Sequence, residues 1–396
     1  MLYRKAPKTG DELSILGFGC MRLPLKDGRI DEERATRQLR HAIDRGVNYV
    51  DTAWPYHGGE SEPFVGRALA GGYRERVRVA TKLPAWLVQS RADMDRYLDA
   101  QLEKLATSRI DYYLVHSLNG PAWERMAALG AGEFLGRARA DGRIGNAGFS
   151  FHGAPHEFPR IVDGYPWEFC QIQYNYLDTE RQAGTAGLRY AASKRLAVIV
   201  MEPLRGGMLG GEPPAPVAAL WHEAERPRSP AEWALRWVWD HPEVTVVLSG
   251  MNDETQIEEN LATAAGGRAG SLTAAETELV ARAGAKYREI MKVECTGCSY
   301  CLPCPSGVDI PSSFDAFNVW HTFGKPQQAN FSYIVRAAGI FTRQPAYASL
   351  CSRCMDCEEK CPQSLPIPDL LDQVAALFEG EGFREREAMI RRMLQN

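Results

Sequence analysis

The sequence predicts an α/β protein in which a (β/α)8 barrel is followed by a small, mostly helical, cysteine-rich domain. Two observations support this prediction. Before residue 290, short β-rich runs alternate with longer amphipathic stretches, and only two of the 10 cysteines lie in this part. After residue 290, the remaining cysteines lie in two compact runs. We therefore expect two domains, residues 1–290 and residues 291–396.

The runs that we interpret as strands are short and rich in β-branched and aromatic residues. Amphipathic helical patterns separate them, and one such helix is opened by a Ser-Pro start signal. The repeated strand–helix order implies parallel pairing, and eight units in about 270 residues fit a closed barrel better than an open doubly wound sheet. The predicted strands span residues 15–19, 47–53, 77–83, 111–117, 144–150, 168–175, 196–204 and 244–250.

The composition argues against two classes of partner. The chain has 46 Lys and Arg against 50 Asp and Glu, a net charge of −4, and contains no long basic run. Binding to nucleic acid or to a membrane surface needs clustered positive charge, so we expect neither. We find no signal-peptide pattern and no apolar run of membrane-spanning length, and we expect a cytoplasmic protein.

In the cytoplasm thiols stay reduced, so the cysteines are better candidates for metal ligands or buried residues than for disulfides. Cys20 and Cys170 lie in or beside predicted strands of the barrel. We interpret these two as buried strand residues and the other cysteines as metal ligands.

Four polar residues fall at the ends of three successive predicted strands, where a barrel of this type places its chemistry. Asp51 and Tyr56 follow the second strand, Lys82 ends the third and His116 ends the fourth. Each alone could be structural, as a strand-end cap, a packed aromatic, a solvated end or a core histidine. Their occurrence together favours a catalytic site.

With these residues in view, the sequence resembles the aldo/keto reductases over about residues 10–290. The resemblance is carried by GVNYVDTAWPY, by the ATK around Lys82 and by YYLVHS, and it continues in GESEPFVGRAL, IGNAGFS, QIQYN and LSGMNDETQIEEN. It implies NAD(P)H-dependent reduction of a small-molecule carbonyl, or the reverse oxidation of an alcohol. Tyr56 would be the general acid, with its phenolate stabilised by the Lys82 ammonium. Asp51 would hold Lys82, and His116 would orient the carbonyl oxygen.

The same resemblance implies that NADP(H) or NAD(H) lies across the mouth of the barrel. Ser150 and Gln171 match positions that hold the nicotinamide carboxamide, and Glu259 with Asn260 match adenine contacts. A glycine pair after the seventh strand would let the backbone approach the pyrophosphate, although a simple turn is the alternative. This pair is Gly206 and Gly207.

Several positions depart from the family pattern. Phe151 replaces a common Asn, Met201 replaces the aromatic that commonly stacks on nicotinamide, and Met21 stands where many members have Trp. Trp54 is a candidate wall of the substrate pocket, with core packing as the alternative. The basic residues that usually bind the adenosine 2′-phosphate are replaced by Gly250, Met251 and Gln256.

The cysteine runs have the spacings CxxCxxCxxCP and CxxCxxCxxxCP, and the second is the bacterial ferredoxin pattern. Three closely spaced cysteines wrap one [4Fe-4S] cube while the fourth serves the other cube, so we predict two clusters in a ferredoxin-like domain. Paired zinc sites are the alternative, but these more often use separated CxxC pairs. The predicted ligand sets are Cys295, Cys298, Cys301 and Cys361 for one cluster, and Cys351, Cys354, Cys357 and Cys304 for the other.

Together the motifs indicate an iron-sulfur branch of the aldo/keto reductases, and three hypotheses follow. The first is a carbonyl reductase or alcohol dehydrogenase with structural, sensory or ancillary clusters. The second is an electron-transfer oxidoreductase with a ferredoxin-type partner. Nicotinamide moves two electrons and a cluster one, so this hypothesis needs a converter such as flavin, for which we find no sequence signature. The third, a non-catalytic redox sensor, is disfavoured by the intact tetrad.

Overall fold

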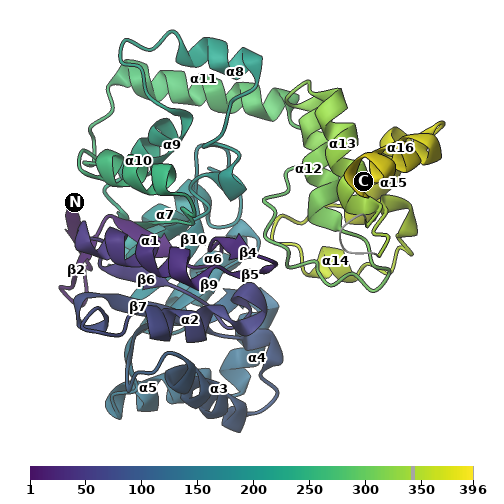
Figure 1. The fold of residues 1–396 in the computed structure, drawn as a ribbon. Coiled ribbons are helices and arrows are strands. Elements are labelled where there is room, and N and C mark those ends of the chain that lie inside the picture. Colours follow the sequence, from purple (N-terminus) through teal and green to yellow (C-terminus); the bar gives the residue numbers. More distant parts are fainter. Residues whose placement is uncertain (340–343, 396) are drawn as a thin grey trace. The chain divides into compact units, whose positions relative to one another are not determined.

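The computed structural model describes residues 1–339 and 344–395, which form two compact units (Figure 1). The barrel unit comprises Met1–Leu204 and Ser229–Thr277, and the cysteine-rich unit comprises Arg205–Arg228 and Glu278–Asn396. The segment Arg205–Arg228 therefore packs with the cysteine-rich unit, although the rest of the chain on both sides of it belongs to the barrel unit. The predicted domain boundary at residue 290 stays a prediction.

Eight parallel strands close into a barrel, which confirms the predicted fold class. Their order around the barrel is β10-β11-β12-β3-β6-β7-β8-β9. Each of them overlaps one of the eight runs predicted from the sequence. The strands are β3 (Leu16–Gly19), β6 (Tyr49–Asp51), β7 (Arg78–Leu83), β8 (Ile110–Leu118), β9 (Ile144–Phe151), β10 (Phe169–Gln173), β11 (Ala197–Met201) and β12 (Val244–Ser249).

Side chains fill the barrel interior, so the barrel is a core and not a pore. Tyr112 packs edge-to-face against both Tyr49 and Phe169 there. An N-terminal hairpin of β1 (Tyr3–Lys5) and β2 (Glu12–Ser14) adds Leu13 to the same cluster. The interior is thus packed, which leaves the loops after the strands to supply the chemistry. A second small hairpin consists of β4 (Leu25–Lys26) and β5 (Arg29–Ile30).

The barrel helices begin at local capping signals. Ser90 and Asp93 form a capping box at the start of α3, and the Ser229 hydroxyl accepts a hydrogen bond from the Glu232 N–H at the start of α9. The helices of this unit are α1 (Glu32–Asp44), α2 (Ser61–Ala68), α3 (Arg91–Lys104), α4 (Gly120–Ala128), α5 (Ala131–Ala140), α6 (Phe158–Asp163), α7 (Gly184–Ser193), α9 (Pro230–Trp239) and α10 (Glu254–Ala264).

The cysteine-rich unit is mostly helical, as predicted. An ion pair between Arg282 and Glu223 joins α11 to the segment after α8. Both cysteine runs continue into a helix that begins with Ile-Pro, so α12 and α15 start at equivalent points of an internal repeat. Its helices are α8 (Ala215–Trp221), most of α11 (Ala274–Ile290), α12 (Ile310–His321), α13 (Pro326–Ala337), α14 (Asp356–Glu359), α15 (Ile367–Phe378) and α16 (Phe383–Gln395).

Within the described residues, we find no helix that combines the length and the apolar character needed to cross a membrane.

Candidate active site and cluster site

Three of the four predicted catalytic side chains meet where the barrel strands end. Asp51 is the last residue of β6, Lys82 lies near the end of β7, and Tyr56 begins a 3-10 turn after β6, η1 (Tyr56–Gly59). The Lys82 Nζ donates to Asp51 Oδ1 at 2.7 Å, to the Thr52 carbonyl at 2.8 Å and to the Tyr56 hydroxyl at 3.4 Å. These bonds hold the ammonium directly beside the phenol oxygen.

Burial dominates the electrostatics of the Asp51–Lys82 pair. The side chains are 4% and 1% exposed, and removal from water raises the pKa of the Asp51 carboxyl and lowers that of the Lys82 ammonium. The attraction between the two charges opposes both shifts. Each charge is tolerated because the other one compensates it, so loss of either partner would leave an isolated buried charge.

His116, in β8, lies against the same site. Its ring packs edge-to-face with Tyr56, with centroids 6.3 Å apart, and contacts Trp86 at 5.1 Å. Burial, reinforced by the Lys82 charge, lowers the pKa of His116 well below its usual value. The imidazole is therefore neutral at neutral pH and can orient a carbonyl oxygen without competing with Tyr56 as an acid.

The aromatic beside His116 is one that the sequence reasoning missed. Trp86, in the 3-10 turn η3 (Ala85–Leu87), is 48% exposed and covers the His116 ring. Trp54, the predicted pocket wall, instead packs against Tyr97, and the Lys104 ammonium lies over its ring. No motif distinguishes Trp86 in the sequence, since its role follows from the turn after β7.

Ser150 and Gln171, the predicted carboxamide contacts, are register partners on the neighbouring strands β9 and β10. Both are buried, and the Ser150 hydroxyl accepts a hydrogen bond from the Ser117 N–H at 2.8 Å. The Gln171 Nε2 contacts the Met201 sulfur at 3.7 Å, and its Oε1 has no hydrogen-bond partner among the described residues. A buried, unsatisfied acceptor fits an amide ligand such as a carboxamide.

Two departures from the family pattern differ in their surroundings. Phe151 is fully buried and packs edge-to-face on Phe158 at 5.0 Å, so its ring belongs to the core. Met201 is partly buried beside Gln171 at the end of β11.

The remaining predicted nucleotide contacts are spread over both units. Asn260, on α10, donates to the Ser249 hydroxyl at 3.0 Å, and the Glu259 carboxylate accepts from the Ser229 hydroxyl. Gly206 and Gly207 belong to the cysteine-rich unit, in the 3-10 turn η5 (Arg205–Gly207). Their φ angles of 69° and 99° lie in the left-handed region, which favours glycine at both positions.

An ion pair near the predicted adenosine contacts was also missed. Arg22 and Glu202, in the loops after β3 and β11, approach to 3.5 Å. A Cβ atom added at Gly250 would lie 3.3 Å from the Arg22 side chain, so glycine leaves room for this arginine. Arg22 thus places a positive charge beside Gly250, where the sequence alone showed only a missing one.

A chain of hydrogen bonds extends from the end of β9. His152 pairs with the Gln182 side-chain oxygen at 3.1 Å, Gln182 donates to Gln173 at 3.1 Å, and Gln173 donates to Asp178 at 2.8 Å. Burial lowers the pKa of His152 from 6.5 to about 4. Folding therefore favours the neutral imidazole of His152.

We expect this histidine to make the protein less stable in mild acid. Between pH 6.5 and about 4 the unfolded chain binds a proton at His152 that the folded chain does not, so stability falls as pH falls. The slope approaches ~1.4 kcal/mol per pH unit for each such proton. Urea unfolding across this range should show a shallower dependence for His152→Gln than for the unchanged protein. The exposed His156 provides the control, and an equal slope for His152→Gln and His156→Gln would contradict the assignment.

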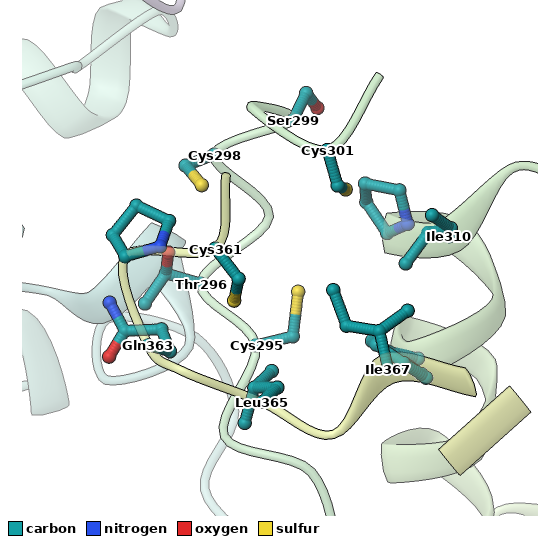
Figure 2. Close-up of a pocket in the computed structure, with 13 residues that line it drawn as sticks. Cys295, Thr296, Cys298, Ser299, Cys301, Ile310, Cys361, Gln363, Leu365 and Ile367 are labelled. Carbon is teal, nitrogen blue, oxygen red and sulfur yellow. The ribbon is translucent and has the colours of Figure 1, made fainter. Parts of the chain in front are cut away.

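Four cysteines converge in the cysteine-rich unit (Figure 2). Three come from the first run and one from the second, and their sulfur atoms line one cavity, as the ferredoxin pattern predicts. Ile310 and Ile367, at equivalent positions of the internal repeat, form part of its apolar wall. A cavity lined by thiols and apolar side chains fits an iron-sulfur cube. These cysteines are Cys295, Cys298, Cys301 and Cys361.

The second predicted set is also brought together. Burial, together with the neighbouring thiols of Cys351, Cys354 and Cys304, raises the pKa of Cys357 to about 11. Cys354 is exposed and Cys357 is buried, so this site lies near the surface of its unit. Cys20 and Cys170 are buried in the barrel unit, as predicted.

Both CxxCxxC loops have the same backbone. Gly297 and Ser299 in the first run, and Arg353 and Met355 at the equivalent places in the second, have φ between 56° and 69°. Non-glycine residues adopt this conformation rarely and at a cost in strain, so its repetition indicates a functional constraint. Alternating left-handed residues turn backbone N–H groups inward, and the Gly297 N–H lies 3.3 Å from the Cys295 sulfur.

The fold and these two sites together define an oxidoreductase barrel with an iron-sulfur domain. Residues 15–266 match the aldo/keto reductase family, and residues 294–365 match the 4Fe-4S dicluster domain. The chain therefore belongs to the aldo/keto reductase family.

Individual relatives agree with this assignment. The chain is 26% identical to L-galactose dehydrogenase of Arabidopsis thaliana over 280 residues, 65% of this chain and 86% of that protein. An aldo-keto reductase of Bacillus halodurans in its holo form superposes with a TM-score of 0.60 at 24% identity, covering 72% and 96% of the two chains. One from Klebsiella pneumoniae in complex with NADPH gives 0.58 at 21% identity, covering 71% and 95%. The two structural matches show the fold of the barrel.

Proposed function

We propose that this protein reduces a small-molecule carbonyl with NAD(P)H, or oxidises the corresponding alcohol, and carries two [4Fe-4S] clusters. The observation that carries the catalytic part is the Lys82 ammonium, held by Asp51 at 2.7 Å and directed at the Tyr56 hydroxyl at 3.4 Å. The other two nucleotide-dependent roles that we assign, to Ser150 and Gln171, rest on their adjacent burial on β9 and β10.

The chain's own residues supply the proton chemistry. A bound nicotinamide would provide the two-electron donor for the carbonyl carbon. Tyr56 gives its hydroxyl proton to the carbonyl oxygen, so that the oxygen becomes an alcohol and the tyrosine a phenolate. Lys82 stabilises that phenolate, and Asp51 keeps Lys82 charged and in place. His116, as a neutral hydrogen-bond donor, orients the oxygen toward Tyr56.

Nucleotide binding is proposed for the mouth of the barrel. The unsatisfied Gln171 Oε1 can accept from a carboxamide N–H, and Ser150 lies beside it. We assign the adenine to Glu259 and Asn260 and the pyrophosphate to Gly206 and Gly207. The absence of the usual basic residues at Gly250, Met251 and Gln256 leaves NADH and NADPH both as candidate donors, with Arg22 as the nearby cation that could favour the phosphate.

The two clusters are proposed from the cysteine sets. Each set supplies four thiols from both runs, which is the cross-ligation of two-cluster ferredoxins. The repeated left-handed loops and the match to a dicluster domain support a cube in each set over a zinc ion.

A second candidate function is electron transfer between a ferredoxin-type partner and a cofactor in the barrel, with flavin as the converter. The near-surface position of the second cysteine set favours it, because Cys354 is exposed and electron exchange with a partner needs a short path. Phe151 favours it as well, since its ring is buried in the core where a nicotinamide contact is common in the family.

Anaerobic mixing of the cluster-loaded protein with NADPH, and separately with NADH, should distinguish the two functions. Nicotinamide and cluster absorbance are followed together, first without substrate and then after addition of a carbonyl compound. For a carbonyl reductase we expect neither signal to change until the carbonyl compound is present, after which nicotinamide is oxidised while the clusters keep their absorbance. Bleaching of the clusters on mixing, without a carbonyl compound, would instead establish an internal electron path.

A further inference from the structure

An arginine is buried next to the first cysteine set. Arg205 belongs to the cysteine-rich unit and is 1% exposed. Its φ of 48° is in the left-handed region, a conformation that a non-glycine residue keeps only where its surroundings hold it. The tetrad, the cysteine motifs and the predicted nucleotide contacts give this side chain no role.

The guanidinium of Arg205 is fixed at the entrance to the first cysteine run. Its Nη2 donates to the Glu294 carbonyl at 3.1 Å, and its Nη1 lies 3.1 Å from the Met291 sulfur. The Glu294 carbonyl belongs to the peptide bond that joins Glu294 to Cys295. The positive charge is therefore one residue away from a predicted cluster ligand, and it acts on the Cys295 thiol by favouring its thiolate form.

One-electron reduction changes the charge of an iron-sulfur site without breaking a bond. A [4Fe-4S] cube with four thiolates carries a charge of about −2 when oxidised and about −3 when reduced. A neighbouring positive charge stabilises the more negative form, and burial reduces the screening of that interaction by water. Charge and hydrogen bonds around the ligands are the means by which proteins set cluster potentials.

We propose that Arg205 raises the reduction potential of the cluster held by Cys295, Cys298, Cys301 and Cys361. This inference rests on the proposed clusters, and it makes Arg205 a positioning and tuning residue. It also places the tuning charge immediately before Gly206 and Gly207, so the segment assigned to the nucleotide is continuous with the one that contacts the cluster.

The second cysteine set has a different arginine, which offers a matched control. Arg353 lies inside the second run, is half exposed and pairs with both Asp369 and Asp372. Its charge is shared by two carboxylates and screened by water, so it should influence a cluster much less than a buried arginine does. The internal repeat thus provides one tuned and one untuned site in the same chain.

The test is an anaerobic potentiometric titration of the cluster-loaded full-length protein with dithionite as the one-electron donor. Low-temperature electron paramagnetic resonance and visible absorbance follow the two reduction steps. The variants are Arg205→Met and Arg205→Gln, which remove the charge, Arg205→Lys, which keeps it, and Arg353→Met. Iron and sulfide are measured first, because the chain without clusters would contradict the proposed function itself and would be recognised by that analysis.

We expect one of the two midpoint potentials to fall in Arg205→Met and in Arg205→Gln, while the other stays at its wild-type value. Arg205→Lys should restore most of the shift, and Arg353→Met should move neither midpoint. Unchanged potentials in both neutral variants, an equal shift of both midpoints, or a shift in Arg205→Lys as large as in Arg205→Met would overturn the proposal. Loss of one cluster from both neutral variants would also overturn it, since Arg205 would then be a structural clamp.

Discussion

Replacement of Tyr56 by Phe should lower kcat by about 10²–10⁴-fold while the nucleotide still binds. The substitution removes one oxygen atom, the one that Lys82 Nζ approaches at 3.4 Å, and leaves the ring in its packing against His116. Proton delivery to the carbonyl oxygen is then lost, whereas Ser150 and Gln171 are untouched. Steady-state kinetics with a panel of aldehydes and ketones, together with fluorescence titration of NADPH and NADH, would measure both quantities.

Tyr190→Phe is the control for this substitution. The Tyr190 hydroxyl, on the outer helix α7, donates to Asp163 at 2.6 Å in an exposed contact, so its loss changes the same functional group away from the site. We expect turnover of Tyr190→Phe to remain near the wild-type value. If Tyr56→Phe kept most of the turnover as well, Tyr56 would not be the acid and the proposed mechanism would be wrong.

The barrel could be predicted because its strands have a strong pattern and its topology leaves few choices. Each of the eight strands is a short apolar run between amphipathic helices, and parallel pairing follows from the crossovers. The hairpins β1–β2 and β4–β5 were not predicted, since strands of three and two residues carry no periodicity. Their position is decided by packing under the barrel and in a loop, which are tertiary effects.

The catalytic site was predictable for a geometric reason. Parallel strands of one barrel end at the same rim, so Asp51 and Lys82 had to lie close together once β6 and β7 were recognised as neighbours. The Thr52 carbonyl and the Trp86 ring were not predictable, because a backbone acceptor and a turn conformation leave no signature in residue types. Trp54 illustrates the opposite error, in which proximity to Tyr56 along the chain was taken as proximity to the substrate.

The cysteine sets could be predicted because the geometry of a cube fixes the spacing of its ligands. Arg205 could not, since its contact with Glu294 joins residues 89 positions apart and no motif links them. The assignment of the Arg205–Arg228 segment to the cysteine-rich unit is likewise a property of packing alone.

Cys361→Ser should remove the first cluster and leave the second, although Cys361 lies in the second run. Its sulfur lines the cavity of Cys295, Cys298 and Cys301, and a serine hydroxyl is a much poorer ligand for iron than a thiolate. We expect iron and sulfide to fall to about half of the wild-type content, with one of the two reduction steps lost.

Cys304→Ser is the reciprocal variant, because Cys304 lies in the first run yet belongs with Cys351, Cys354 and Cys357. It should abolish the other reduction step, so the pair of variants assigns each step to one cavity. Ligation within each run would give the opposite result, with Cys361→Ser losing the step that cross-ligation assigns to Cys304. Carbonyl turnover of folded Cys361→Ser then separates the two candidate functions: full turnover takes the first cluster out of the reaction path, and loss of turnover together with that reduction step places the cluster in it.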